Sequence, residues 1–476
     1  MEEKKFVTEL TDINCDLSQW YTDVITKTDL CDYGPVKGTM VIKPYGYEIW
    51  EHIQDFLNVE FKKHGVKNAY FPMLIPESFL KKEAEHVEGF APEVAVVTYA
   101  GGQELNEKLI IRPTSETIIG EMYSKWIKSY RDLPMIMNQW CNVVRWEKTT
   151  RPFLRTSEFL WQEGHTVQAT EQDAINNTME MLEVYKKMCR ELLAIPVLSG
   201  KKTERERFAG AVSTYAIEAV LRDGKCLQAG TSHFLGQNFA KSANIKFLDK
   251  DGQLKYGYTT SFGVSTRLIG AVVMVHGDER GIKLPPRIAP IQAVIVPIAQ
   301  HKDGVLENAQ KLYDRLNRVG IRVFVDDREQ SAGWKFNEWE MKGVPVRLEL
   351  GPRDIENDVV TVVRRDTHEK LTMPLKDIEK SIATMLDEIQ ENLYQMALSY
   401  VKDNSKVVNS VDEMVKMVAN RHVTIACHCG DIACEQALKD ETGIQSRVII
   451  EDCHNDEKCV RCGKKAKYKA YFAKQY

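Results

Sequence analysis

The sequence predicts a multidomain protein of mixed α+β and α/β class. At 476 residues the chain is too long for one core and should form about two to four domains. Three prolines within six residues, in the segment Leu284–Pro290, mark a linker, and beyond it strand and helix patterns alternate. Six cysteines crowd into Cys427–Cys462, which indicates a further small unit near the end. We therefore expect domains at 1–284, 291–395 and 396–476.

Composition and charge narrow the class of protein. The chain is 43% hydrophobic and 28% charged, as is ordinary for a soluble globular protein. Its net charge is −4, so any nucleic-acid site must be a local basic patch. The polar start Met1–Phe6 does not resemble a secretory signal, and no run approaches the roughly 18 apolar residues of a membrane span. We expect a cytoplasmic protein without a membrane partner.

Apolar spacing places the elements of the first domain. Residues 46–63 carry apolar side chains three and four apart, which is typical of an amphipathic helix, and a short strand follows at Asn68–Pro72. Further along we expect helices at 171–194 and 204–222, a strand entering a loop at Cys226–His233, and a segment Thr260–Arg267 that leads into an apolar helix at Leu268–His276.

The second domain should alternate strands and helices. The pattern predicts strands at Ile291–Ile298, Ile321–Val325 and Val344–Leu350, with a helix at 304–319. This order is typical of a small α/β domain with a largely parallel sheet. Residues 374–420 are predicted to be strongly helical and charged, and they lead to the cysteine-rich end.

A polar run from Arg112 to His165 is the most informative part of the chain. Its charged clusters, Arg112–Glu116, Arg145–Glu147 and Phe153–His165, are separated by strand-like apolar stretches. Charges this dense are costly to bury unless they are paired or bind a ligand. A strand–loop–strand that presents two arginines inward therefore indicates a polyphosphate site, because the arginine fork binds phosphate bidentately and keeps its charge.

This run resembles motif 2 of the class II aminoacyl-tRNA synthetases. Thr114-Ser115-Glu116 and the ending Trp161-Gln162-Glu163-Gly164-His165 narrow the resemblance to prolyl-tRNA synthetases of the archaeal/eukaryotic-type, zinc-tailed branch. The resemblance extends over essentially the whole chain. It implies an ATP-dependent ligase that converts L-proline to prolyl-adenylate and pyrophosphate and then transfers proline to the 3′ end of tRNA(Pro).

The resemblance also implies an architecture. Residues 1–284 would form a class II catalytic domain on an antiparallel sheet, 291–395 an α/β anticodon-binding domain, and 396–476 a small zinc-binding α/β domain. The helix at 46–63 and its following strand resemble motif 1, which builds the dimer interface in this family, so a homodimer is implied. Periodicity alone is equally consistent with an ordinary core helix. The segment 260–276 resembles motif 3.

The first half-reaction joins a carboxylate to the α-phosphate of ATP. It depends on positioning and electrostatic stabilisation rather than on a nucleophilic side chain. By match to the motifs, Arg145 and Arg267 are the catalytic residues, and Mg²⁺ accompanies the nucleotide. Glu147 should share a strand face with Arg145, because it follows two residues later. The residues implied for ATP are Arg145, Glu147, Arg155, Gln228, Thr231, Ser265 and Arg267.

Proline offers an apolar ring, a carboxylate and a secondary ammonium, so its pocket needs an apolar wall and an acceptor. A lone histidine such as His165 is more often structural, and only its place in the motif favours His233. The stretch Phe90–Val94 matches a family segment near the nucleotide. The residues implied for proline are Thr114, Glu116, Arg145, Trp161, Glu163, His233 and Gly263.

Substrate discrimination in such a pocket should be incomplete. One methylene is worth only ~1–3 kcal/mol in binding, and cysteine and alanine are close to proline in size, so we expect both to be misactivated. Some bacterial-type relatives carry a large editing insertion between motifs 2 and 3. Here only about 60 residues separate His165 from Cys226, which predicts that the chain has no cis-editing domain.

The second domain mixes aromatic and charged residues between 326 and 347. This combination suits single-stranded bases, which are stacked on rings and recognised by their edges. The resembling family recognises guanines at the second and third anticodon positions. Our anticodon candidates are Phe336, Glu340 and Arg347, while Trp334 and Trp339 are equally consistent with core residues.

The concentration of cysteines favours metal binding over a disulfide framework. Cys429-x₄-Cys434 and Cys459-x₂-Cys462 fit a closed, four-thiolate structural Zn²⁺ site. The neighbours Cys427, His428, Cys453 and His454 leave the ligand set open, as does the choice between zinc and iron. In the resembling family the carboxylate of the C-terminal tyrosine, here Tyr476, can reach the active site.

Two other functions stay open at this point. Another class II synthetase, such as a threonyl or glycyl enzyme, is disfavoured by the Thr-Ser-Glu element and the zinc tail, and Cys141 lacks the partners that a threonyl enzyme's pocket zinc would need. A catalytically retired, synthetase-like RNA-binding regulator would have lost motif arginines. Arg145, Arg155 and Arg267 are all present.

Overall fold

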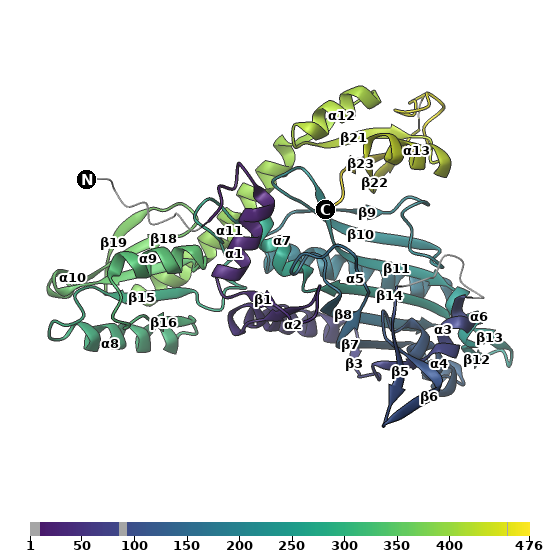
Figure 1. Ribbon diagram of the computed structural model, residues 1–476, viewed down its shortest axis with the longest axis horizontal. Helices are drawn as coiled ribbons and strands as arrows, with labels where there is room; N and C mark the ends of the chain where they lie inside the picture. Colours follow the sequence, from purple (N-terminus) through teal and green to yellow (C-terminus); the bar gives the residue numbers. More distant parts are fainter. Residues whose placement is uncertain (1–9, 85–92, 455) are drawn as a thin grey trace.

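The computed structural model describes residues 10–84, 93–454 and 456–476, and it confirms the mixed α/β class. Figure 1 shows three units: a large central one, a second at the left and a third at the top right. Helix α11 (Ile378–Asp403) runs from the second unit towards the third. Among the described helices, none is long and apolar enough to cross a membrane.

The central unit is built on a seven-stranded sheet in the order β3-β7-β8-β14-β11-β10-β9. All neighbouring pairs are antiparallel except β3 with β7. Helices α2 (Pro44–Lys63), α5 (Glu171–Glu191) and α7 (Arg267–His276) pack their apolar faces into the core of this unit. The strands are β3 (Lys67–Asn68), β7 (Met135–Val144), β8 (Glu158–Gln168), β9 (Val197–Lys201), β10 (Ser213–Val220), β11 (Cys226–Gly236) and β14 (Tyr258–Ser265).

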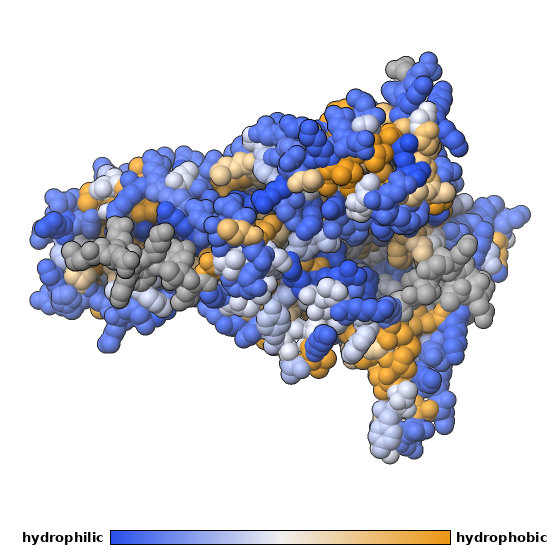
Figure 2. All heavy atoms as spheres, turned by 45° about the horizontal axis from the view of Figure 1, so that its top comes forward, coloured by the Kyte–Doolittle hydropathy of each residue, from blue (hydrophilic) through white to orange (hydrophobic). Residues whose placement is uncertain are grey.

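Smaller elements surround this sheet. A three-stranded sheet, in the order β4-β6-β5, projects downward in Figure 1. Figure 2 shows hydrophobic side chains gathered near this projection, where Leu74 and Val96 are exposed. The surrounding elements are α1 (Leu17–Lys27), β1 (Cys31–Tyr33), β2 (Met40–Ile42), β4 (Leu74–Pro76), α3 (Glu77–Ala84), β5 (Ala95–Ala100), β6 (Gln103–Ile111), α4 (Glu116–Trp126), α6 (Asn238–Ala243), β12 (Lys246–Leu248) and β13 (Leu254–Tyr256).

The second unit holds a five-stranded sheet in the order β16-β15-β17-β18-β19. The expected parallel sheet covers only its first three strands, because β18 and β19 are antiparallel. The connections from β17 onward are too short for the long crossover that a parallel neighbour requires. Its elements are β15 (Ala293–Pro297), α8 (Val305–Arg318), β16 (Val323–Val325), α9 (Ala332–Met341), β17 (Val346–Leu350), α10 (Pro352–Glu356), β18 (Val359–Arg364) and β19 (Lys370–Pro374).

The third unit is a four-stranded sheet in the order β20-β21-β23-β22. The helical pattern predicted at 374–420 forms two helices, because α11 ends at Asp403 and a short strand follows before α12. That strand pairs with β21, and Ser410 caps the new helix by accepting a hydrogen bond from the Glu413 amide. The elements are β20 (Ser405–Val407), α12 (Val411–Ala419), β21 (Val423–His428), α13 (Ile432–Thr442), β22 (Gln445–Asp452) and β23 (Tyr468–Ala473).

Two further predictions in the central unit are corrected. The helix expected at 204–222 is the strand β10, which lies between β9 and β11 with nearly every side chain buried. Its apolar residues do not alternate with exposed polar ones, because both faces are covered, and periodicity does not distinguish such a strand from a buried helix. The strand expected at Asn68–Pro72 shrinks to β3, because the Phe71 amide donates to the Gln139 side chain instead.

Candidate active site

A cleft of about 480 Å³ lies on the face of the central sheet opposite α5. Gln162 of β8 points to the α5 side of the sheet, where its side chain accepts a hydrogen bond from Tyr185. Its neighbours in the strand point to the other side, into the cleft. Residues two apart in a strand share a face, so three strands line the cleft by alternation. They contribute Trp161, Glu163 and His165 from β8, Ser261, Gly263 and Ser265 from β14, and Thr231 and His233 from β11.

The strand register brings these side chains into rows. Glu163 pairs with Gly263, which pairs with Thr231, and His165 pairs with Ser261, which pairs with His233. Every substrate residue predicted from the sequence lines this cleft except Glu147 and Arg155. Residues more than 100 positions apart in the chain therefore meet in one site.

Glu147 and Arg155 lie in the loop between β7 and β8. The Arg155 guanidinium donates to Glu147 at 2.8 Å, and its side chain is 59% exposed. The expectation that Glu147 shares a strand face with Arg145 is wrong, because β7 already ends at Val144. Of the stretch Phe90–Val94, the first three residues lie outside the described part of the chain, and the carbonyl of Glu93 accepts the Trp146 amide at 3.1 Å.

Arg145 is held before any ligand arrives. Its Nε donates to the Pro113 carbonyl at 3.0 Å, and its guanidinium lies 5.5 Å from the Phe159 ring and 5.4 Å from the Trp161 ring. Burial lowers the pKa of Arg145, and the surrounding carboxylates oppose that effect. The side chain is thus a fixed cation at one wall of the cleft.

Arg267 begins helix α7 and faces the same cleft. It donates to the carbonyls of Leu154 at 3.0 Å and Gln228 at 3.2 Å. Burial, then the nearby Arg145 cation, lowers the pKa of Arg267 to about 10, so it stays protonated at neutral pH. Among the described residues neither arginine has a carboxylate within ion-pair distance. Two half-buried, like-charged groups held by neutral carbonyls make a site for an anion.

The other end of the cleft is acidic. Glu163 is 2% exposed, accepts from Gln139 at 2.7 Å and from the Ser115 amide at 3.2 Å, and pairs with His165 Nε2 at 2.8 Å. Burial favours the neutral carboxyl, but the bonds and charge of His165 outweigh it, and the pKa of Glu163 is lowered. Beside it, Glu116 accepts a hydrogen bond from the Thr114 hydroxyl. This end suits a small cation such as an ammonium group.

A ring wall closes the acidic end. His233 Nδ1 lies 3.0 Å from the Thr214 hydroxyl, and its ring centroid is 4.7 Å from that of Phe208. Burial, with help from the His165 charge, lowers the pKa of His233 to about 3, so the ring is neutral. Phe208 and Thr214 were missed from the sequence because 204–222 was predicted as a helix. Phe159 also lines the cleft, and its position two residues before Trp161 was a usable signal.

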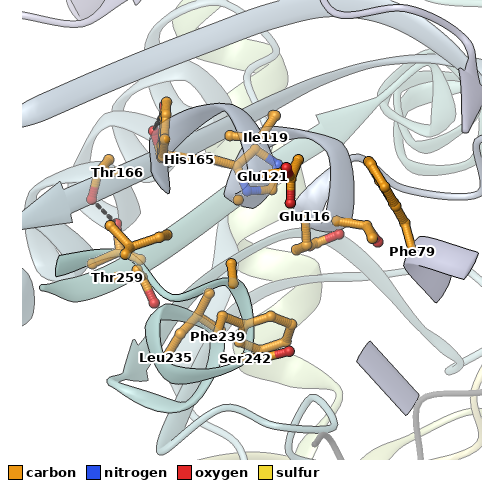
Figure 3. A pocket seen from close by; sticks show the side chains of 16 residues that line it. Phe79, Glu116, Ile119, Glu121, His165, Thr166, Leu235, Phe239, Ser242 and Thr259 are labelled. Atoms are coloured by element: carbon orange, nitrogen blue, oxygen red, sulfur yellow. Dashed lines mark hydrogen bonds between the residues drawn. The ribbon is translucent and has the colours of Figure 1, made fainter. Parts of the chain in front are cut away.

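A smaller cavity of about 90 Å³ lies behind the acidic end (Figure 3). It shares Glu116 and His165 with the cleft, and Figure 3 shows Phe79, Leu235 and Phe239 around it. Most of its lining is apolar. The polar cleft and the smaller apolar cavity therefore meet at Glu116 and His165, which lie between them.

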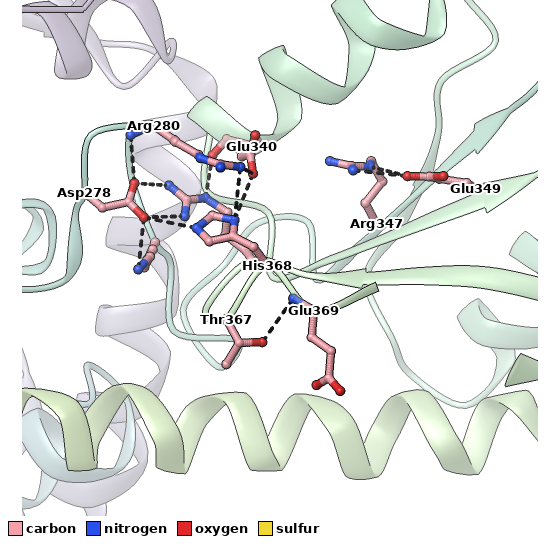
Figure 4. Close-up of polar contacts among 10 residues, drawn as sticks. Asp278, Arg280, Glu340, Arg347, Glu349, Thr367, His368 and Glu369 are labelled. Atoms are coloured by element: carbon pink, nitrogen blue, oxygen red, sulfur yellow. Dashed lines mark hydrogen bonds and ion pairs between the residues drawn. The ribbon is translucent and has the colours of Figure 1, made fainter. Parts of the chain in front are cut away.

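The three anticodon candidates lie in the second unit. Phe336 and Glu340 are on α9 and Arg347 is on β17, with the Arg347 guanidinium 4.2 Å from the Phe336 ring centroid. Glu340 bonds to Arg280 and His368 (Figure 4). Of the two tryptophans, Trp339 is buried and donates to Asp326 at 2.8 Å, whereas Trp334 is 39% exposed.

The cysteine-rich end contains a compact donor group. His428, Cys429, Cys434 and Cys459 place ligand atoms within 4.8 Å of one another. The fourth predicted ligand, Cys462, is exposed, with its Sγ 3.7 Å from that of Cys429. The buried Nε2 of His428 has no hydrogen-bond partner among the described residues, which leaves it free to bind an ion. These donors fit a tetrahedral Zn²⁺ site.

Tyr476 is not among the residues that line the cleft. Its hydroxyl accepts from Arg151, which belongs to the loop between β7 and β8, and its ring lies 5.3 Å from Lys225 Nζ. The Tyr476 amide donates to the Cys226 carbonyl at 3.1 Å. The end of the third unit is therefore anchored on the loop that follows Arg145.

Three family models match the chain. Residues 97–276 match the model described as "tRNA synthetase class II core domain (G, H, P, S and T)". Residues 292–385 match "Anticodon binding domain", and residues 411–476 match "Prolyl-tRNA synthetase, C-terminal". The matches follow the same order as the three units of the fold.

Full-length relatives and a solved structure agree with these matches. "Proline--tRNA ligase 2" of Clostridioides difficile (strain 630) is 56% identical over 477 residues, which cover 100% of this chain and 99% of the relative. "Proline--tRNA ligase" of Alkaliphilus oremlandii (strain OhILAs) is also 56% identical, over 478 residues with the same coverage. A crystal structure of the Cryptosporidium parvum prolyl-tRNA synthetase, complexed with halofuginone and AMPPNP, has a TM-score of 0.95 and 38% identity, covering 100% of this chain and 99% of that one.

Proposed function

The chain belongs to the class II prolyl-tRNA synthetases, and we infer from this premise that it is a proline–tRNA ligase. It activates L-proline with ATP, releases pyrophosphate and transfers proline to tRNA(Pro). The observation that carries this assignment is one cleft with two ends. One end holds two arginines that form no ion pair with any described residue, and the other is an acidic, ring-walled pocket. The full-length identity to proline–tRNA ligases favours neither another class II specificity nor a synthetase-like regulator that has lost catalysis.

We propose that Arg145 and Arg267 bind the phosphates while the acidic end holds the amino acid. The proline carboxylate attacks the α-phosphorus, the bond to the leaving pyrophosphate breaks, and the fixed guanidinium groups stabilise the added negative charge. Gln228, Thr231 and Ser265 line the nucleotide side, and Mg²⁺ bound to ATP would neutralise part of its charge. The nucleotide analogue in the C. parvum structure supports a nucleotide in this cleft.

For proline itself, Glu163 and Glu116 would accept the secondary ammonium, with Thr114 orienting Glu116. The neutral His233, Phe208 and Trp161 would contact the ring. Gly263 leaves space for it, since a Cβ there would lie against the Trp161 ring at 3.7 Å and only 3.1 Å from the Gln162 carbonyl oxygen. A wall of this kind selects by size, so cysteine and alanine should be activated weakly. Between β8 and β11 the chain holds only α5, β9 and β10, which supports the absence of a cis-editing domain.

We propose that the third unit carries a structural Zn²⁺ and that the chain belongs to the archaeal/eukaryotic-type branch. The support is the Cys/His donor group, the match of residues 411–476, and the C. parvum structure. The domains proposed are 1–284, 291–395 and 396–476, although α11 continues through the last boundary. Phe336, Glu340 and Arg347 remain the proposed anticodon contacts.

We propose a homodimer formed through the motif 1 face. Around α2 several apolar side chains are exposed in one region of the sequence, which is typical of a surface that a partner covers. The free cysteine thiols of the whole chain, together with its substrates tRNA and ATP, support a cytoplasmic location for the protein. The exposed apolar residues are Tyr33, Val36, Val41, Tyr47, Val59, Tyr70 and Leu74.

The test is charging of tRNA(Pro) by the purified chain with ATP and labelled proline. We expect proline to become acid-precipitable with the tRNA and to be released by mild alkali, which cleaves an aminoacyl ester. A preparation that activates proline but never charges tRNA(Pro) would overturn the second step. A preparation that does neither would overturn the function.

A further inference from the structure

A buried ion-pair cluster joins the end of α7 to the second unit (Figure 4). Asp278 lies two residues past α7, and Arg365 binds both of its carboxylate oxygens, at 2.8 and 2.7 Å. Lys283 Nζ lies 3.0 Å from the same carboxylate, and His368 Nε2 lies 3.6 Å away. The side chains of Asp278 and Arg365 are 7% and 3% exposed, so this pair is shielded from solvent.

The same cluster holds the C-terminal end of α9. Arg365 Nε donates to the Glu340 carbonyl at 2.7 Å, while the Glu340 carboxylate accepts from Arg280 at 2.9 Å and contacts His368 Nδ1 at 3.0 Å. Arg365 thus binds Asp278 and α9 at once. His368 does the same through its two ring nitrogens.

Backbone contacts make this connection stiff. The Ile282 amide donates to Met341 at 3.0 Å, and the Leu284 amide donates to Gly343 at 3.1 Å. Gly281, at φ +130°, has no room for a side chain, because a Cβ would lie 2.5 Å from the Met341 carbonyl oxygen. Gly343, at φ +77°, would place a Cβ 2.8 Å from the Ile282 carbonyl oxygen. Close-packed backbones of this kind transmit a small displacement rather than absorbing it.

The junction lies between two functional ends. Helix α7 begins with Arg267 in the cleft and ends beside Asp278. Helix α9 carries the exposed Trp334 and the ring of Phe336 on the anticodon unit, and it ends at the junction. One short helix on each side therefore connects the ATP cleft to the candidate anticodon surface.

We propose that this junction couples anticodon binding to the position of Arg267, with Asp278, Arg365 and His368 as positioning residues. The inference rests on the proposed function. A base bound against α9 shifts its C-terminal end, the cluster carries the shift to the end of α7, and Arg267 takes its productive place. Glu340, which is also a proposed anticodon contact, anchors this connection through Arg280 and His368.

The test needs variants that break the junction without leaving a buried charge alone, since a single unpaired ion in such a site is strongly destabilising. The triple variant, Asp278→Asn with Arg365→Gln and Lys283→Gln, removes the three buried charges of the cluster together. His368→Gln is a milder second variant at a side chain that is 28% exposed. The matched control is Arg190→Gln, which removes a 2.7 Å ion pair to Glu391 that joins α5 to α11 and touches neither α7 nor α9.

Each folded variant is assayed for kcat/KM with tRNA(Pro) and with tRNA(Pro) carrying one substituted anticodon guanine. Proline-dependent ATP–pyrophosphate exchange is measured without tRNA. The ratio of interest is kcat/KM with native tRNA(Pro) divided by kcat/KM with the substituted tRNA. We expect the triple variant to lower this ratio about tenfold, through kcat, which is within the usual range of coupling between sites. His368→Gln should lower it about threefold. For both variants the rate of ATP–pyrophosphate exchange without tRNA should stay within twofold of wild type. Arg190→Gln should change neither this rate nor the kcat/KM ratio.

The proposal is overturned if the folded triple variant keeps the wild-type ratio, or if His368→Gln keeps it when the triple variant does not fold. It is also overturned if exchange without tRNA falls in parallel with charging, or if Arg190→Gln gives the same loss. Failure of the proposed function looks different, because the wild-type chain would then show no proline-dependent exchange at all.

Discussion

Replacing Arg145 by lysine isolates the part of the active site that depends on the shape of the guanidinium. Lysine keeps the positive charge and most of the side-chain length. It cannot donate to the Pro113 carbonyl and bind a phosphate with two parallel bonds at the same time. A site that needs only a cation would tolerate this change, whereas the proposed clamp would not.

The expected loss follows from the contacts of Arg145. The bond from Nε to Pro113 is a hydrogen bond from a charged donor, whose removal costs about 1.5 kcal/mol. Losing one of the two bonds of the fork to phosphate costs a further ~1–2 kcal/mol. Together they amount to about 3 kcal/mol, which corresponds to a fall of roughly a hundredfold in kcat/KM for ATP.

The assay is proline-dependent ATP–pyrophosphate exchange over a range of ATP concentrations. The matched control is Arg155→Lys, because Arg155 lies in the same loop region but is exposed, pairs with Glu147 and does not line the cleft. We expect that control to lose less than about fivefold. Equal losses in the two variants, or a loss below about tenfold for Arg145→Lys, would refute the assignment of Arg145 as the phosphate clamp.

Further predictions concern the pocket, pH, metal and C-terminus. Glu163→Gln should raise the KM for proline about tenfold or more with the KM for ATP within twofold, and exchange kinetics with an unchanged proline KM would contradict it. Burial lowers the pKa of His276 to about 4, whereas an unfolded histidine titrates near 6.5, so the unfolded state binds more protons between these values. Stability should therefore fall as pH drops from 6.5 to 4, by about 1.4 kcal/mol per pH unit for this group, and urea unfolding of His276→Asn should show a shallower dependence. Metal analysis should find one zinc per chain, and Cys459→Ser should lose it and lower the melting temperature; full zinc content in that variant would exclude Cys459 as a ligand. Deleting Tyr476 or extending the chain beyond it should lower kcat several-fold by freeing Arg151, with zinc content unchanged, and identical kinetics would show that the contact is dispensable.

The parts of the site that could be predicted are those with a local signature. Trp161, Glu163 and His165 stand two apart, and in a strand this spacing is enough to place them on a common face. Helix α2 was visible from its apolar spacing, and the cysteine spacing indicated a metal group. These features depend on neighbours in sequence, which a single chain displays directly.

What escaped prediction depends on distant contacts. The sequence pattern predicts a helix where β10 lies, because both faces of this strand are buried, and that prediction hides the roles of Phe208 and Thr214. Arg155 points to solvent because the loop after β7 turns it towards Glu147, and no local pattern specifies that turn. The junction of Asp278 with Arg365 joins positions 87 residues apart, so neither residue is conspicuous alone.

The most direct test of the account is ATP–pyrophosphate exchange by the wild-type chain with each standard amino acid in turn. The cleft predicts that proline gives by far the highest kcat/KM, with weak exchange for cysteine and alanine, because its wall selects by size and its acidic end accepts the ammonium group. Stronger exchange with any other amino acid, or no exchange with proline, would contradict it.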